Sequence, residues 1–106
     1  MVSGSQITED IKKRLSEKFG EEEFSAAMER ARIRADLMKV LRARRIECNM
    51  DQTELAALLN TNQQQISRYE SGENNLSVDR LLVYAKALNL EIEIKDKDDD
   101  RVLITV

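Results

Sequence analysis

Long amide side chains and one guanidinium gather in a short segment near the middle of the chain. Residues 63–70 read QQQISRYE, and helical periodicity turns the isoleucine and the tyrosine to one side. The other side then carries Gln63, Gln64 and Arg68. A glutamine amide can bond N6 and N7 of adenine together, and an arginine guanidinium can bond O6 and N7 of guanine. The segment therefore predicts a helix that reads base edges in a major groove.

An alternative interpretation of the same face is a solvated surface on an ordinary helical hairpin. Glutamine-rich helix faces are common, since the side of a helix that faces water is usually polar. A face built only for solubility, however, favours glutamate and lysine over long amides. The residues around the segment are needed to choose between the two interpretations.

Two short helices joined by a tight turn are predicted to position this face. The first covers residues 52–59, where apolar residues recur at helical spacing. Asn60 can adopt the left-handed conformation that a sharp exit from a helix needs. Asn62 can cap the second helix, residues 63–70, through its side-chain oxygen, and Gly72 stands at the expected stop position.

This arrangement resembles the Cro-like, or XRE, phage-repressor type of helix-turn-helix domain. The resemblance covers about residues 37–90 and implies a mainly α protein with a five-helix lambda-repressor-like DNA-binding domain. The sequence departs from the family at Asn60, where glycine is usual, and at Asp51, where threonine or serine often caps. Both substitutes can do those jobs. The matching residues occur in order: Gln52, Glu54, Leu55, Ala56, Leu59, Asn60, Asn62, Gln63, Ile66, Ser67, Arg68, Glu70, Ser71 and Gly72.

The resemblance implies a role for each matching polar residue. Gln63, Gln64 and Arg68 would face base edges. Arg45 and Glu70 match a pair that, in family members, ties the helix before the motif to the end of the recognition helix, and we interpret this pair as structural. The DNA backbone would be contacted by Gln52, Asn62, Ser67, Asn74 and Asn75.

The composition fits one small helical domain without catalytic chemistry. The chain has 106 residues, no proline and 3 glycines, so one domain with long helices is expected. It has no histidine and a single cysteine, Cys48, so no cofactor, no metal cluster and no enzymatic nucleophile–histidine pair are expected. Cys48 itself is predicted to be a small, half-buried residue, and its solitary state points to a reducing, cytoplasmic compartment. No apolar stretch approaches the length of a membrane span, and a signal-peptide core is missing.

The net charge of -3 is unevenly distributed. Residues 30–45 contain seven bases against Asp36, a local charge of +6, which leaves -9 on the remainder. The local field decides the attraction of phosphates, because salt screens charges beyond a Debye length of ~8 Å. Arg42 and Arg44, nearest the motif, are the predicted phosphate contacts, and a solvated helix face with scattered bases is the alternative.

Helices are also predicted before the motif. An amphipathic helix should cover about residues 9–19, and a longer one should run from Glu21 to about Ile46. Three consecutive glutamates favour a helix start at Glu21. The inner stripe of the longer helix, interpreted as core or dimer contact, comprises Phe24, Met28 or Ala31, Ala35, Met38 and Leu41 or Arg42.

One more helix and a β-hairpin are predicted after the motif. Ser77 should cap a helix that ends at Leu88. Residues 91–95 alternate strictly, 97–100 form a polar turn, and 101–106 have high β propensity. A lone hairpin is marginal in water, so it needs its own helices, a second copy or another protein's sheet edge as a partner. The inward residues of the helix are predicted to be Leu81, Leu82, Ala85 and Leu88.

The whole layout resembles antitoxins of type II toxin-antitoxin modules, most of all the HigA-like group. The parts are an N-terminal helical extension (1–36), the central domain (37–90) and a short C-terminal β tail (91–106). The resemblance implies a homodimer that binds operator DNA, represses its own operon and neutralises an mRNA-cleaving toxin. A phage or restriction-control repressor without a toxin partner is one alternative, although it would need no extra helix. A protein-interaction adaptor is another, and the polar face of residues 63–68 argues against it.

Overall fold

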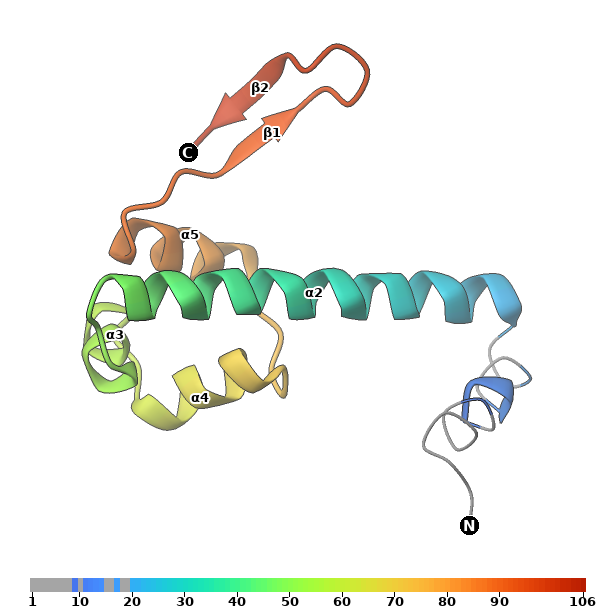
Figure 1. The fold of residues 1–106 in the computed structure, drawn as a ribbon, viewed down its shortest axis with the longest axis horizontal. Helices are drawn as coiled ribbons and strands as arrows, with labels where there is room; N and C mark the ends of the chain where they lie inside the picture. Colours follow the sequence, from blue (N-terminus) through green and yellow to red (C-terminus); the bar gives the residue numbers. More distant parts are fainter. Residues whose placement is uncertain (1–8, 10, 15–16, 18–19) are drawn as a thin grey trace. The chain divides into compact units, whose positions relative to one another are not determined.

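The computed structural model describes residues 9, 11–14, 17 and 20–106, and it is mainly α-helical (Figure 1). Residues 11–14 are helical, while the rest of the predicted helix at 9–19 lies largely outside the described residues. The predicted mainly α fold with a C-terminal hairpin is confirmed. The further elements are α2 (Glu21–Glu47), α3 (Gln52–Leu58), α4 (Gln63–Ser71), α5 (Val78–Ala87), β1 (Glu93–Lys95) and β2 (Val102–Thr105).

Helix α2 runs across the point, between Ala35 and Asp36, at which the chain divides into two compact units. Acidic residues occupy its first turn and arginines its last, an order that the helix dipole favours at both ends. Met38 and Leu41 are buried, whereas Met28 is 45% exposed. Among the described residues, the predicted inner stripe is buried at Met38 and Leu41, where α3, α4 and α5 supply packing partners.

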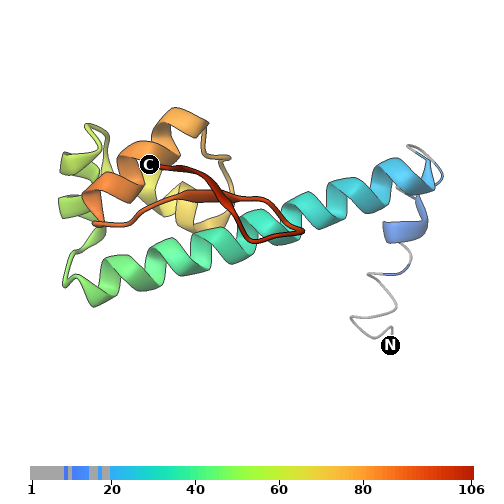
Figure 2. The ribbon, with the colours of Figure 1, turned by 90° about the horizontal axis from the view of Figure 1, so that it is seen from above.

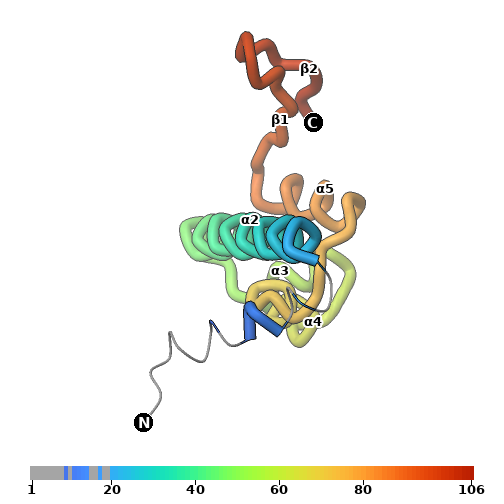
Figure 3. The backbone as a smooth tube through the Cα atoms, turned by 90° about the vertical axis from the view of Figure 1, so that its right-hand side faces the viewer, coloured from blue at the N-terminus to red at the C-terminus, as the bar shows by residue number. Residues whose placement is uncertain are grey.

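The apolar core of the second unit is formed by residues from α2, α3, α4 and α5 (Figures 1 and 3). Full burial of one large apolar side chain stabilises the fold by about 1.5–3 kcal/mol, so these few residues dominate the packing energy. Met50, Leu76, Leu81, Ala87 and Leu90 pack around the core at its margin. Its largest fully buried side chains are Leu55, Ile66, Tyr84 and Leu88.

Tyr84 occupies the inner face of α5, on which the sequence predicts Leu82 instead. Leu82 is 39% exposed, so its prediction as a core residue is wrong. The buried face follows the spacing of Leu81, Tyr84, Ala85 and Leu88, and the tyrosine ring fills the volume at its centre. Tyr69 of α4 meets this ring edge to face, with ring centroids 6.2 Å apart and an interplanar angle of 77°.

Helices α2 to α5 all end in the same C-terminal capping motif. Asn49, Asn60, Gly72 and Asn89 each follow a helix and adopt positive φ angles of 54°, 54°, 84° and 55°. In each case the N–H of the next residue donates to the carbonyl five positions back, at distances from 2.8 to 3.1 Å. This Schellman geometry satisfies carbonyls that the helix itself leaves open. Cys48, in the turn after α2, is exposed, so its prediction as a half-buried residue is wrong.

Helices α3, α4 and α5 each begin directly after the residue that the sequence predicts as their N-terminal cap. Asp51 Oδ1 accepts from the N–H of Glu54 at 2.7 Å, and Glu54 Oε1 accepts from the N–H of Asp51 at 3.3 Å, a complete capping box. Asn62 and Ser77 each cap a helix by a single bond: their side chains accept from the N–H of Gln65 in α4 and of Arg80 in α5. The helix boundaries are therefore specified locally, by residues within one turn of each end.

The hairpin of β1 and β2 is antiparallel and exposed along both strands (Figure 2). Ile94 pairs with Ile104, and the backbones of Ile92 and Val106 exchange two hydrogen bonds of 2.8 Å. Both strands are shorter than predicted: β1 begins at Glu93 and β2 ends at Thr105, and the register shifts between Ile94 and Lys95. Among the described residues, none of the helices combines the length and apolar character needed to cross a bilayer.

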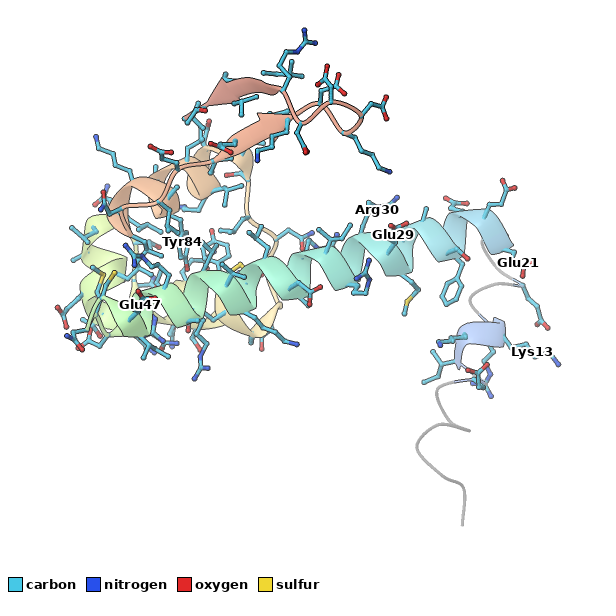
Figure 4. The ribbon with its side chains drawn as sticks, turned by 45° about the horizontal axis from the view of Figure 1, so that its top comes forward. Lys13, Glu21, Glu29, Arg30, Glu47 and Tyr84 are labelled. Carbon is cyan, nitrogen blue, oxygen red and sulfur yellow. The ribbon has the colours of Figure 1, made fainter. Side chains whose placement is uncertain are left out.

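The hydroxyl of Tyr84 is buried without a hydrogen-bond partner, in the centre of the packed helices (Figure 4). Burial raises the pKa of this phenol far above its usual value of 10.0, and the charge of Glu70 raises it further. An unsatisfied buried hydroxyl costs about 1–3 kcal/mol of stability. The ring is therefore stabilising, while its oxygen is not.

The substitution Tyr84→Phe keeps the ring and removes the hydroxyl, so we expect a free energy of unfolding equal to or up to ~2 kcal/mol above wild type. Tyr84→Ala should lower it by about 3–5 kcal/mol.

The folded phenol stays protonated where the unfolded one ionises, so wild-type stability must fall as the pH rises above ~10. Tyr84→Phe should show a shallower decline. Urea titrations followed by circular dichroism between pH 7 and 11 measure both effects, and a clear loss of stability in Tyr84→Phe at pH 7 would reveal a partner for the hydroxyl.

Candidate nucleic-acid interface

The turn between α3 and α4 presents one polar face of α4 to solvent. Asn60 lies in the left-handed region, and Asn62, in extended conformation, accepts the N–H of Gln65 at 2.9 Å to start α4. Ile66 and Tyr69 anchor the inner side of α4, with exposed fractions of 0% and 7%. The outer side carries Gln63, Gln64, Ser67 and Arg68, all exposed. The positions assigned from sequence to base reading are therefore on one accessible face.

A buried ion pair between α2 and the end of α4 holds this face in place. Arg45 Nε lies 2.6 Å from Glu70 Oε1, and Arg45 Nη2 lies 3.3 Å from Glu70 Oε2, so the pair is bidentate. The two side chains are only 10% and 5% exposed. The remaining side of the guanidinium donates to the carbonyl of Met50 at 2.8 Å, which fixes the turn before α3. The pair expected from family resemblance thus joins three elements.

Gln52 extends this network to the N-terminal end of α4. Its Nε2 donates to Glu70 Oε2 at 2.7 Å, and its Oε1 accepts from Gln63 Nε2 at 2.6 Å. The orientation of the Gln52 amide follows from chemistry, because a carboxylate only accepts and must face the amide nitrogen. The result is a continuous chain, Arg45–Glu70–Gln52–Gln63, which runs from the buried pair to the exposed face.

Gln52 and Gln63 keep hydrogen-bonding capacity beyond this network. An amide nitrogen has two protons, and Gln52 Nε2 uses one of them on Glu70. Gln63 likewise uses one amide proton on Gln52, so its oxygen and second proton stay available for a base edge. A residue oriented in advance loses little conformational entropy when it binds, and this favours a DNA-reading role for Gln63.

Arg68 is also accessible, and it is only weakly engaged within the protein. Its guanidinium lies 3.9 Å from Glu73, in a pair whose side chains are 55% and 67% exposed. Asn74 donates to Gln65 Oε1 at 3.3 Å, so its amide secures the loop after α4 to the helix. Asn75, beside it, is exposed.

The two arginines predicted to contact phosphates lie on opposite flanks of α2. At about 100° per residue, Arg42 and Arg44 are separated by roughly 160° around the helix. Arg44 donates to the carbonyl of Leu88 at 3.0 Å and to Glu47 at 3.1 Å, so it ties α2 to the end of α5. Arg42 is exposed, on the other flank. Of the two predicted phosphate contacts, Arg42 is therefore the exposed one, and the guanidinium of Arg44 is engaged within the protein.

Two linking contacts are visible only in the structure. The sequence assigns Gln52 to a phosphate alone, although its amide bridges Glu70 and Gln63. Arg80 donates to the carbonyl of Leu59 at 2.5 Å and so fastens the end of α3 to α5. Neither contact has a local sequence signal, because each joins residues at least eleven positions apart. Within the described part of the chain, no group of three or more metal-binding side chains comes together.

Removal of one partner of the buried pair should be costly. Glu70→Ala leaves the Arg45 guanidinium buried without its counter-charge, and we expect the free energy of unfolding to fall by about 3–5 kcal/mol. Glu73→Ala removes the same charge from an exposed side chain and should change it by less than ~1 kcal/mol. Chemical denaturation at neutral pH compares the two variants directly. If both variants lose the same free energy of unfolding, the buried pair contributes no more to stability than an exposed one.

Comparison with known protein families gives one match to this part of the chain. The model of a helix-turn-helix family matches residues 41–95, more than half of the 106 residues, and this range includes α3, the turn and α4. Searches of curated proteins and of solved structures each find no match. The matched range contains the ion pair, the Gln52 bridge and the outer face of α4. The chain therefore belongs to the Cro/XRE-like helix-turn-helix family of DNA-binding transcription regulators.

Proposed function

We propose that this protein is a sequence-specific repressor that reads operator DNA with the outer face of α4. The observation that carries the proposal is the chain of contacts Arg45–Glu70–Gln52–Gln63, which orients the N-terminal end of an exposed polar face. Gln63, Gln64 and Arg68 read base edges in the major groove. A repressor acts by occupying its site, so no catalytic group is needed.

Contacts to the DNA backbone set the position of α4 in the groove. The N-terminal end of α4, which has no acidic residue in its first turn, presents backbone N–H groups that favour phosphate. Arg42 adds charge, and affinity should decrease with salt as phosphate contacts release counterions. The proposed backbone contacts are Gln52, Asn62, Ser67, Asn74, Asn75, Arg42 and Arg44. Arg44 is the weakest member of this set because its guanidinium is occupied by Leu88 and Glu47.

The protein acts as a homodimer in this proposal. Two copies related by a two-fold axis place two α4 helices about one turn of DNA apart, ~34 Å, and so match an operator with two-fold symmetry. Two half-sites multiply the specificity that one short helix can supply.

A titration against the DNA upstream of the protein's own coding sequence tests the proposal. An unrelated duplex of equal length is the control, and both are measured at two salt concentrations. Tight binding to the upstream DNA that weakens with salt is expected. Equal, weak binding to both duplexes would contradict a repressor and favour an adaptor that keeps only the fold.

Arg68→Ala should weaken operator binding by about 1–3 kcal/mol and relax the preference at one base position per half-site. Lys95→Ala, an equal loss of charge in the hairpin, should leave base preference unchanged. Gel-shift titrations against operators mutated at single positions measure both quantities. An Arg68→Ala variant with wild-type affinity and preference would place the reading face elsewhere.

We propose further that the repressor is the antitoxin of a type II toxin-antitoxin module and neutralises an mRNA-cleaving toxin encoded beside it. Apolar side chains that DNA binding does not require support a protein partner: Met28 and Ile33 on α2 are 45% and 53% exposed, and Leu103 on β2 is 57% exposed.

Expression of the neighbouring reading frame alone should arrest growth, and co-expression of this chain should restore it. Arg68→Ala should restore growth equally, because base reading is not involved. If the neighbouring reading frame does not arrest growth, or if this chain does not restore growth, the antitoxin role is contradicted.

A further inference from the structure

The carbonyl of Leu59, at the end of α3, accepts a hydrogen bond from a side chain of another helix. Arg80 Nη1, in the first turn of α5, donates to this oxygen at 2.5 Å. The exit of α3 does not use the same oxygen, because its two backbone bonds go to the carbonyls of Ala56 and Ala57. Leu59 thus carries one of the carbonyls that a helix end leaves open, and a cation is favoured beside it.

The backbone of Arg80 is itself fixed at the start of α5. Its N–H donates to Ser77 Oγ at 3.0 Å, the bond that caps this helix. In the described part of the chain no carboxylate forms an ion pair with Arg80, so the Leu59 carbonyl is the contact that orients its guanidinium. The residue is half-buried. Arg80 therefore joins the capped start of α5 to the end of α3.

The end of α3 leads directly into the helix that carries the polar face. Residues 60–62 alone separate Leu59 from Gln63. The bond from Gln63 to Gln52 restrains the start of α4, and the bond from Arg80 restrains the chain just before it. The other contacts of Leu59 are apolar, and apolar packing has no preferred direction. Loss of the Arg80 bond therefore leaves the turn, and with it the start of α4, less closely oriented.

We propose that Arg80 is a positioning residue for DNA reading, which orients α4 through the Leu59 carbonyl without contacting DNA itself. The inference rests on the proposed function and adds to it a residue outside both α4 and the Arg45–Glu70 network. Hydrogen bonds to base edges weaken steeply when their angles change, so a small rotation of α4 weakens them. Attraction to phosphates depends on charge and tolerates such a rotation. Loss of Arg80 therefore reduces sequence preference more than general attraction to DNA.

The substitution Arg80→Met keeps a long side chain and removes its donor and its charge. The contact is only partly buried, so water can bond the Leu59 carbonyl instead, and the variant should stay folded by circular dichroism. We expect binding to the DNA upstream of the coding sequence to weaken by about 10-fold, comparable with the loss of one base contact. Binding to an unrelated duplex should change by less than about 2-fold, and the salt dependence should equal that of wild type, because no phosphate contact is lost.

Two further variants separate the position of the charge from its presence. Arg101→Met removes an arginine from the hairpin and should leave both affinities unchanged. Arg80→Lys keeps a charged donor, and one donor suffices for one carbonyl, so it should recover most of the affinity for the upstream DNA. Gel-shift titrations at two salt concentrations compare these variants with wild type. If Arg80→Met weakens both duplexes equally and makes the salt dependence shallower, Arg80 contacts phosphate and the proposal is overturned. Wild-type affinity and preference in Arg80→Met would overturn it as well.

Amide hydrogen exchange reports on the turn without DNA. The N–H of Thr61 donates to the carbonyl of Ala56 at 2.9 Å, directly beside the Arg80 contact. Its exchange should be about 10-fold faster in Arg80→Met and unchanged in Arg101→Met, because local opening becomes easier where a restraint is lost. A wild-type protein that does not prefer its upstream DNA would contradict the repressor itself. Preference in wild type together with unchanged exchange in Arg80→Met would contradict only the role of Arg80.

Discussion

The ion pair between Arg45 and Glu70 is the contact on which the placement of the outer face of α4, the face that we propose to read DNA, depends. Transfer of two charges out of water costs several kcal/mol per ion, and this cost is recovered only if further hydrogen bonds complete the pair. Here the Met50 carbonyl and the Gln52 amide complete it. The energetic demand of a buried charge therefore dictates where the turn before α3 and the first residue of α3 must lie.

Apolar packing alone would define this surface less well. Hydrophobic contact is not directional, so a core of leucine, isoleucine and tyrosine tolerates small rotations of one helix on another. A bidentate guanidinium–carboxylate pair accepts one geometry. Because Glu70 lies near the end of α4 and Gln63 at its start, the network constrains α4 at both ends. The core supplies most of the stability, and the polar network supplies the orientation.

Much of the fold could be predicted from sequence because its boundaries are local. The caps at Asp51, Asn62 and Ser77 act within three residues, and the exit at Asn60 needs only that residue's tolerance of positive φ. The two faces of α4 follow from periodicity. The family resemblance supplies the rest of the motif, including the partnership of Arg45 with Glu70.

The remaining errors concern contacts between distant parts of the chain. Periodicity shows which residues share a face of α5 but not how much volume the core must fill, so it favours Leu82 where Tyr84 is buried. The apolar stripe on α2 extends in the sequence back to Phe24, whereas among the described residues its buried members are Met38 and Leu41. Similarly, the bridge through Gln52 depends on a carboxylate eighteen residues away. Patterns along the chain report what a residue can do, while its neighbours in space decide what it does.

The shared geometry of the four helix exits has a consequence for the order of folding. Each exit closes within five residues, so a helix end can form before any tertiary contact is made, and chains rich in such local contacts fold quickly. The Arg45–Glu70 pair joins residues 25 apart and must wait until α2 and α4 have docked. The face of α4 that we propose to read DNA thus depends on a contact that requires docked helices, whereas the helix ends depend only on residues close in sequence.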